Sequence, residues 1–319
     1  MSDDIMEKTF QVTAPARLSV SNIRGSVTVQ PGDPGVIHAT AVKHNGFDGG
    51  KYSVEMVQNA DGSVRVETRS HESMFGFLAH PPKVEYTLRV PQEIQLDVTC
   101  ISATVDARSL SGKFKLRTVS GRINLADLSG QLNLNTVSGD ISGTNLTGPL
   151  EVEAVSGRVQ ALDSSFATAS VSTVSGNMHL QTALQDGPYN FSSVSGNVHL
   201  VVPEDTRCSA ELKSVSGNIR SSFPATTSRL GHGLKIVQVQ GGGTAVRMKS
   251  VSGSLSIEVE GVPAVPMTAE APAVHEHPVQ PEHSHQHEEA QLSTAEILQR
   301  IERGEMSVDE AIRQMKDHS

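Results

Sequence analysis

The fold is decided by the stretch Thr118-Val119-Ser120-Gly121-Arg122-Ile123-Asn124-Leu125, whose Val-Ser-Gly core occurs seven times in this chain of 319 residues. The steps between copies are 18, 18, 19, 20, 21 and 36 residues, and we interpret the last step as a double one with a degenerate copy inside. Weaker Leu-Ser-Gly-like copies lie halfway between the early ones. A short repeat of fixed length is typical of a stacked solenoid. The seven copies begin at Val119, Val137, Val155, Val174, Val194, Val215 and Val251, and the weaker copies at Leu110, Leu128 and Leu146.

Each copy predicts one corner and one strand. We expect the Val, the Ile four residues later and the Leu six residues later to point inward, and Ser-Gly to form the corner, where glycine avoids an obstructing Cβ. Two arms of nine residues then close one turn of 18. The predicted fold class is all-β: a single-stranded, β-helix-like solenoid of about 18 residues per turn. Its inward stack in chain order would be Ile123, Ile141, Val159, Met178, Val198, Ile219 and Leu255.

The composition agrees with such a core and excludes some functions. Trp is absent and aromatic residues make up only 3% of the chain, so Val, Ile and Leu must fill the interior. The net charge of −9 is concentrated in the C-terminal part, and a near-neutral body without a basic stripe argues against nucleic acid as a partner. No apolar run is long enough to span a membrane, and the N-terminus lacks the apolar segment of a secretion signal. The expected localisation is cytoplasmic.

Changes in pattern divide the chain into four parts. Residues 1–98 predict an N-terminal antiparallel β layer that caps the solenoid, and residues 99–261 form the solenoid itself. Residues 262–292 combine proline, histidine and glutamate with almost no large apolar residue, which predicts a disordered linker. Residues 293–316 carry two capping boxes, beginning at Ser293 and Ser307, and predict a small α-helical hairpin.

The predicted hairpin needs a surface to pack on, because about 24 residues bury too little area to fold alone. It could pack on a second copy, on another protein, or back on the solenoid. We expect a homo-oligomer or a protein partner bound through this segment, and no nucleic acid. Contact with a membrane surface is left open. The apolar stripe consists of Ile297, Leu298, Ile301, Val308, Ile312 and Met315.

Two further segments are candidates for binding. A loop with Met74, Phe75 and Phe77 could be a sticky patch, or could cover an open end of the core. The linker carries a cluster of imidazoles that could bind zinc, copper or nickel, or could simply be a solvated tract. Its histidines are His275, His277, His283, His285 and His287. No cofactor is expected.

The position after each Val-Ser-Gly should form an outward ladder that fixes register, with a binding face as the alternative. It begins with alternating charge and continues with asparagine. Its members are Arg122, Asp140, Arg158, Asn177, Asn197, Asn218 and Ser254.

A search for catalytic groups argues against an enzyme. The acidic residues of the repeats do not converge, and the repeated serines have no histidine at a matching phase. The carboxylates that we read as scattered are Asp106, Asp127, Asp140 and Asp163.

The run Tyr86-Thr87-Leu88-Arg89-Val90-Pro91, followed by the Ser-Gly-x-Ile repeats, resembles the bacterial putative-adhesin family of β-strand-repeat proteins, a domain of unknown function. The tail from Ile297 to Ala311 is similar to SHOCT-like helical hairpins, which accompany this domain in relatives and are implicated in oligomerisation. The resemblance implies a non-enzymatic scaffold, in some relatives linked to cell-envelope stress, and carries over no catalytic residue.

Three hypotheses follow from the sequence. The leading one is a scaffold or interaction protein that is multimerised or docked through its C-terminal hairpin, with a place in envelope stress. The alternatives are a metal-binding or metal-responsive protein that uses the histidine-rich linker, and a carbohydrate-binding or carbohydrate-active solenoid.

Overall fold

The structure is a computed structural model, and it describes residues 3–44, 52–70, 81–223, 228–229, 234–261 and 265–266. Every regular element in these residues is a β-strand, so the all-β prediction is confirmed for them. Within the same residues no helix could span a bilayer. The predicted helical hairpin, the loop of residues 71–80 and the predicted linker apart from residues 265–266 lie outside the described residues.

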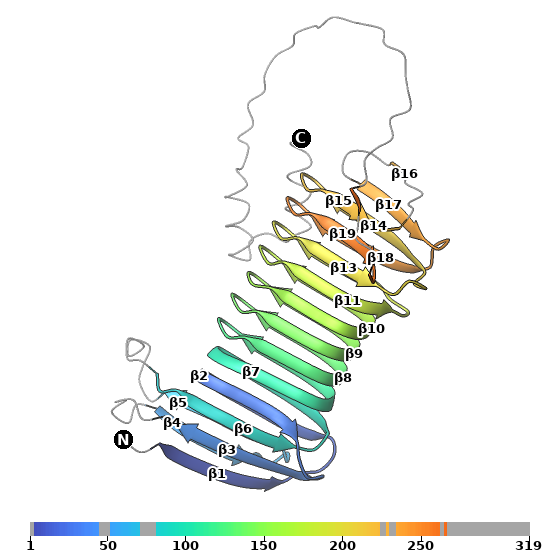
Figure 1. The fold of residues 1–319 in the computed structure, drawn as a ribbon. Helices are drawn as coiled ribbons and strands as arrows, with labels where there is room; N and C mark the ends of the chain where they lie inside the picture. Colours follow the sequence, from blue (N-terminus) through green and yellow to red (C-terminus); the bar gives the residue numbers. More distant parts are fainter. Residues whose placement is uncertain are drawn as a thin grey trace, which may run out of the picture.

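Four long strands build the regular middle of the solenoid (Figure 1); β8, β9 and β10 each bend through one corner, and β7 bends through two. They pair in parallel with a register of 18 residues, so that Ile123 lies opposite Ile141 and Leu116 opposite Leu134. Further along the chain, each turn is divided into two separate strands. The long strands are β7 (Glu93–Thr118), β8 (Ile123–Thr136), β9 (Ile141–Ala154) and β10 (Val159–Thr173), and the next are β11 (Met178–Leu184), β12 (Tyr189–Ser193), β13 (Val198–Val202), β14 (Cys208–Ser214) and β15 (Ile219–Ser221).

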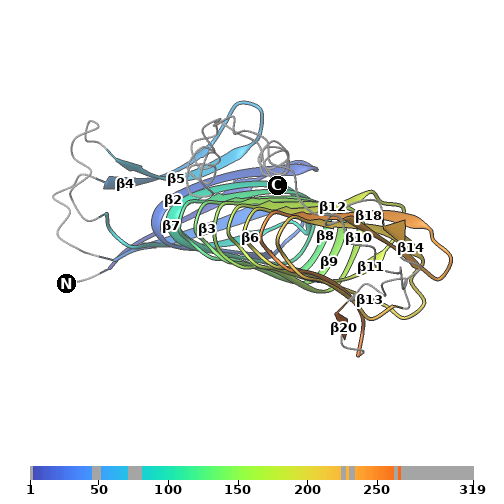
Figure 2. The ribbon, with the colours of Figure 1, turned by 90° about the horizontal axis from the view of Figure 1, so that it is seen from above.

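The stack has two sheet faces with one buried core between them, and Figure 2 shows its flattened cross-section from above. We call the face of the arms that follow each Val-Ser-Gly corner the A face; it contains β11 and β13. The arms that precede the corner form the B face, which contains β12 and β14. Each arm alternates buried and exposed side chains, as a strand with one buried side requires.

The prediction that the Val of each corner points inward is wrong. Thr118 and Ile123 are buried, whereas Val119 and Val137 are exposed. Side chains alternate along a strand, so an inward Thr118 sends Val119 outward. The Thr118 hydroxyl accepts a hydrogen bond from the Gly121 N–H at 3.0 Å and closes the turn, which explains why a polar residue is buried here.

Close stacking of successive corners explains the repeated glycine. A Cβ on Gly139 would lie 1.8 Å from the carbonyl oxygen of Gly121 in the turn below, far inside van der Waals contact. The glycine is therefore required by the approach of two backbones. The prediction that Ser-Gly forms the corner is confirmed.

The turns do not stack in chain order, which corrects the predicted inward stack. Strand β19 (Leu255–Val259) lies between β13 and β15, and β18 (Thr244–Ser250) lies between β12 and β14. Leu255 therefore separates Val198 from Ile219. The step of 36 residues does not hide a degenerate turn. It contains β17 (Leu234–Val239), which pairs antiparallel with β14, and the short β16 (Ser228–Arg229).

At the N-terminal end, β2 (Ala16–Pro31) is itself a complete turn, parallel to β7 along both arms. The predicted cap is thus only partly antiparallel. On the A face, β2 is followed by the parallel β6 (Val84–Val90) and then the antiparallel β3 (Val36–Lys43) and β1 (Asp4–Gln11). On the B face it is followed by the parallel β5 (Val64–Ser70) and the antiparallel β4 (Tyr52–Gln58).

Both faces end on antiparallel strands at the other end of the stack as well. There β17 borders β14 on the B face, and β20 (Val265–Pro266) borders β15 on the A face. These edge strands cover sheet edges that would otherwise offer unpaired backbone groups to another chain.

Candidate binding cleft on the B face

A cleft of about 480 Å³ lies on the B face near the N-terminal end. It is formed where the β4–β5 hairpin stands beside the first turns of the stack, an arrangement visible in Figure 2. Its floor comes from β2, β7 and β8. The lining residues are Arg17, Leu18, Ser19, Ser63, Gln95, Leu96, Asp97, Lys113, Phe114, Lys115, Gln131 and Asn133.

Two lysines give this cleft its chemistry. Lys113 and Lys115 alternate with the buried Phe114 on β7, so both ammonium groups extend from the outer side of the sheet. Residues two apart on a strand are separated by about 6.6 Å. Within the described part of the chain, neither ammonium group forms an ion pair or a hydrogen bond. The cleft therefore offers two positive charges at a fixed spacing.

The other charges of the cleft are already paired. Arg117 donates a hydrogen bond to Asp97 at 2.8 Å, and Arg17 lies 3.8 Å from Asp61. The Ser63 hydroxyl and backbone N–H both donate to Asp61, and these bonds hold the pKa of this carboxyl below its usual value. Asp61 thus stays ionised beside Arg17.

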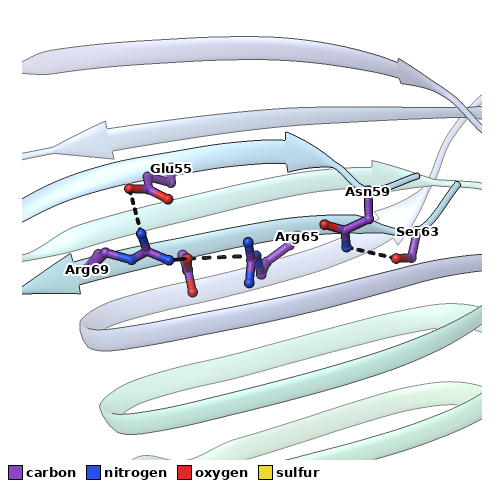
Figure 3. A network of polar contacts seen from close by, with 6 residues as sticks. Glu55, Asn59, Ser63, Arg65 and Arg69 are labelled. Carbon is purple, nitrogen blue, oxygen red and sulfur yellow. Dashed lines mark hydrogen bonds and ion pairs between the residues drawn. The ribbon is translucent and has the colours of Figure 1, made fainter. Parts of the chain in front are cut away.

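Cross-strand contacts hold the β4–β5 hairpin in shape (Figure 3). Arg69 lies 3.2 Å from Glu55 and 2.8 Å from Glu67, so one guanidinium links both strands. At the turn, the Asn59 amide donates to the Ser63 hydroxyl at 2.9 Å. Such exposed pairs add little stability individually, and of these residues Ser63 alone lines the cleft.

The repeat carboxylates are occupied in joining one turn to the next. Asn124 donates to Asp106 at 2.8 Å, and Asn145 donates to Asp127 at 2.7 Å. The description of the acidic residues as scattered needs one correction. Asp127 and Asp163 share one phase with Asn145 between them, and all three have left-handed backbone conformations at stacked corners.

The outward ladder after each Val-Ser-Gly does fix register, but not through charge pairs. The Asp140 carboxylate accepts the backbone N–H of Arg158 at 2.9 Å. The Asn177 side chain does the same for Asn197 at 3.0 Å, and Asn197 for Ser254 at 2.9 Å. The partner of Asn197 is Ser254 because the last turn lies between its neighbours in space.

Nucleophiles are poorly placed for chemistry in the described residues. Burial raises the pKa of the Cys100 thiol to about 12 and that of Cys208 to about 11, which keeps both protonated. Across those residues, no group of three or more histidine, cysteine, aspartate or glutamate side chains could hold a metal ion.

The residues predicted as sites all lie outside the described part of the chain. They are His275, His277, His283, His285 and His287 for metal, and Ile297, Leu298, Ile301, Val308, Ile312, Met315, Met74, Phe75 and Phe77 for interaction. Sequence reasoning missed Lys113 and Lys115. The available signal was a pair of alternating lysines on one nine-residue arm.

This architecture is that of a β-repeat protein, with a large and mostly parallel sheet wound into stacked turns. Residues 16–258 match the sequence profile described as Toastrack DUF4097, and the chain belongs to that family. The resemblance to a β-repeat family of unknown function is therefore confirmed for this part.

Three solved structures are similar to the chain at low sequence identity. A putative adhesin from Bacteroides fragilis is 14% identical, with a TM-score of 0.42; the match covers 81% of this chain and 98% of that one. A putative lipid binding protein from Parabacteroides distasonis is also 14% identical, with a TM-score of 0.39 and coverage of 80% and 96%. A putative cell adhesion protein from Clostridium sporogenes is 11% identical, with a TM-score of 0.27 and coverage of 80% and 100%. No match was found among curated proteins.

Proposed function

We propose that this chain is a non-enzymatic interaction protein whose rigid solenoid binds an acidic, extended segment of a partner protein in the B-face cleft. The observation that supports this most directly is the pair of unpartnered ammonium groups of Lys113 and Lys115, in a cleft whose other charged side chains, Arg17 and Asp97, are paired.

The spacing of the two lysines favours an extended peptide. Alternate side chains of an extended chain are about 6.6 Å apart on one side, as are Lys113 and Lys115 on β7. Acidic residues at alternate positions can therefore meet both ammonium groups at once. A bilayer surface is the alternative ligand, because both lysines are exposed.

The test is a fluorescence anisotropy titration with an eight-residue peptide of alternating glutamate and threonine. A second peptide of the same composition with its four glutamates contiguous serves as the comparison. We expect the alternating peptide to bind more tightly. The double variant Lys113→Ala/Lys115→Ala should weaken binding about 2- to 30-fold, since two exposed ion pairs contribute about 0.4–2 kcal/mol together.

The matched control is Lys213→Ala, because Lys213 lies on the same face near the C-terminal end of the stack. It should leave the affinity unchanged. If the double variant binds each peptide with the same affinity as the unmodified chain does, the proposal is contradicted. Binding to phosphatidylglycerol vesicles that depends on both lysines, without binding of either peptide, would assign the cleft to lipid headgroups instead.

Other expectations about function stay predictions. They comprise multimerisation through the C-terminal hairpin, a role in envelope stress, a cytoplasmic location, and metal binding by the histidine-rich linker. No described residue favours the metal or the carbohydrate alternative over the interaction role.

A further inference from the structure

A second hollow, of about 880 Å³, lies on the A face near the N-terminal end of the stack. It extends over β1, β3, β6, β2 and β7, which lie side by side in this order (Figure 1). We call it the A-face hollow. It shares no lining residue with the B-face cleft. Its charged and imidazole-bearing lining residues are Glu7, Lys8, Asp33, His38, Arg89 and Arg108.

One row of residues across the strands of the hollow carries two arginines. Arg89 on β6 pairs with Gln30 on β2. Arg108 on β7 follows Ala107, whose partner on β2 is Val29, so the same register places Arg108 beside Gln30. Both arginine side chains are exposed. Gln30 therefore lies between two outward-facing arginines whose backbones are two strand spacings, about 10 Å, apart.

The fold itself does not use the two guanidinium groups. Among the described residues, neither arginine forms an ion pair or a side-chain hydrogen bond. Two acidic residues close to them in the sequence have other partners. The Asp33 carboxylate lies 3.5 Å from His38 Nε2, and Asp106 accepts the Asn124 amide at 2.8 Å. Two positive charges therefore face the hollow without a counter-charge from these carboxylates.

The rest of the hollow is mostly uncharged. Lys8 does not add to its positive charge, because the ammonium group donates to the Met56 carbonyl at 2.8 Å. Next to the arginine row is a row of hydroxyls, in which Thr87 on β6 pairs with Thr40 on β3. Glu7 lies opposite Thr40 on β1, at the edge of the face. The hollow is thus basic on β6 and β7 and hydroxylated beside them, with its second carboxylate at the far edge.

The corner after β2 fits closely against Arg89. The Gly32 N–H donates to the Val90 carbonyl at 2.7 Å. A Cβ on Gly32 would lie 2.9 Å from the Arg89 Cβ, closer than real contacts allow. A larger residue at this corner would therefore displace the stem of the arginine, and glycine leaves it room beside the hollow.

We propose that the A-face hollow binds a phosphate monoester, with Arg89 and Arg108 holding the phosphate from both sides above Gln30. A guanidinium presents its N–H donors in a planar fork that matches two oxygens of a phosphate. A phosphate monoester carries nearly two negative charges and three acceptor oxygens, so it can engage both forks and the Gln30 amide. A carboxylate has one charge and two oxygens, and a single fork satisfies it. The threonine hydroxyls are available for hydroxyl groups on the rest of the ligand.

This inference goes beyond the proposed function, which concerns an acidic protein segment on the other face. The two ideas fail separately, because the arginines and the lysines line different hollows. Phosphate monoesters occur both as small soluble metabolites and as the headgroup of phosphatidic acid. The same forks would bind either one, so the experiments must distinguish the two sources.

The first experiment titrates the full chain with sn-glycerol 3-phosphate and follows the phosphorus-31 resonance. We expect saturable binding that Arg89→Ala/Arg108→Ala weakens about 5- to 30-fold, the upper part of the range for two exposed charge pairs, because both contacts are bidentate. The matched control is Arg220→Ala, since Arg220 is an exposed arginine of the same face at the other end of the stack, and the affinity should not change. Dimethyl phosphate, a diester with a single charge, should bind more weakly.

Three outcomes of this titration would overturn the proposal. The first is an affinity that the double arginine substitution leaves unchanged. The second is equal binding of the diester. The third is binding that Lys113→Ala/Lys115→Ala abolishes, because that result would place the phosphate in the B-face cleft.

A charge-preserving variant tests the fork itself. Arg89→Lys/Arg108→Lys keeps both positive charges and removes the planar donors, so it should weaken binding at least about threefold. Unchanged affinity would show that charge alone holds the anion, and would overturn the role given to the guanidinium groups.

Cosedimentation with phosphatidic acid vesicles identifies the source of the phosphate, with phosphatidylcholine vesicles as the control. Binding of glycerol 3-phosphate without binding of these vesicles supports a soluble ligand. Vesicle binding that Arg89→Ala/Arg108→Ala abolishes supports the same site with a lipid headgroup as ligand. Binding of neither probe overturns the proposal.

Discussion

Gly139→Ala tests the stacking of corners on which the whole solenoid depends. The added Cβ would lie 1.8 Å from the Gly121 carbonyl oxygen, where real contacts are not closer than 3.0 Å, so the turns must separate locally by the difference of about 1.2 Å. That movement stretches the hydrogen bonds from Val137 N–H to the Thr118 carbonyl, now 3.2 Å, and from Ser138 N–H to the Val119 carbonyl, now 2.8 Å.

The expected cost follows from those bonds. Two weakened backbone hydrogen bonds and the strain of the corner together lower the free energy of unfolding by about 2–4 kcal/mol. For a domain of this size, the midpoint of thermal unfolding falls by roughly 4–16 °C. Because the chain has no Trp, unfolding is best followed by far-ultraviolet circular dichroism, with urea titrations to obtain the free energy.

Gly62→Ala is the matched control. Gly62 has a positive φ of 78°, but no atom lies within 4 Å of the position that a Cβ would take. This change therefore carries only the backbone cost of a left-handed alanine, about 1 kcal/mol. If Gly139→Ala destabilises the chain no more than Gly62→Ala, close stacking is not the reason for the repeated glycine.

Three further predictions concern single side chains. Thr136→Val removes the hydroxyl that accepts the Gly139 N–H at 2.9 Å, and should lower the free energy of unfolding by about 1–2 kcal/mol in urea titrations; no change would refute this role. Asn197→Ala should speed hydrogen exchange at the backbone amide of Ser254, which donates to the Asn197 side chain, and should leave exchange at the Asn218 amide unchanged. Faster exchange at Asn218 and unchanged exchange at Ser254 would contradict the order of the last turns. Burial is the main reason why the pKa of His179 lies below 6.5, and the charge of His199 lowers this pKa further. The carboxylate of Glu258 acts in the opposite direction and raises it. The unfolded chain thus binds this proton more readily, stability falls as the pH drops below 6.5, and His179→Gln should flatten that loss in thermal melts at pH 5–7.

The repeat predicted much of the middle of the fold. Its period gave the 18-residue register, because Ile123 and Ile141 must occupy the same place in successive turns. The side of the corner valine was predicted wrongly because Val is apolar, whereas the buried position belongs to the preceding Thr118, whose hydroxyl closes the turn. Apolar character alone does not determine which of two adjacent residues faces inward.

The order of the last turns could not be predicted, because a repeat carries no information about which edge it joins. β13 and β15 present the same kind of strand edge, and β19 fits between them as well as beyond them. The cleft was missed for a related reason. Lys113 lies on a repeat arm, but other lining residues come from β2 and, through Ser63, from the β4–β5 hairpin, which joins the B face through a long-range pairing with β2.

The measurement that tests the binding role most directly is photo-crosslinking with the alternating glutamate–threonine peptide, followed by mapping of the attachment sites. The account predicts attachment at the residues that line the cleft, within 17–19, 95–97, 113–115 and 131–133 and at Ser63. Attachment concentrated on the A face or at the C-terminal end of the stack would contradict it.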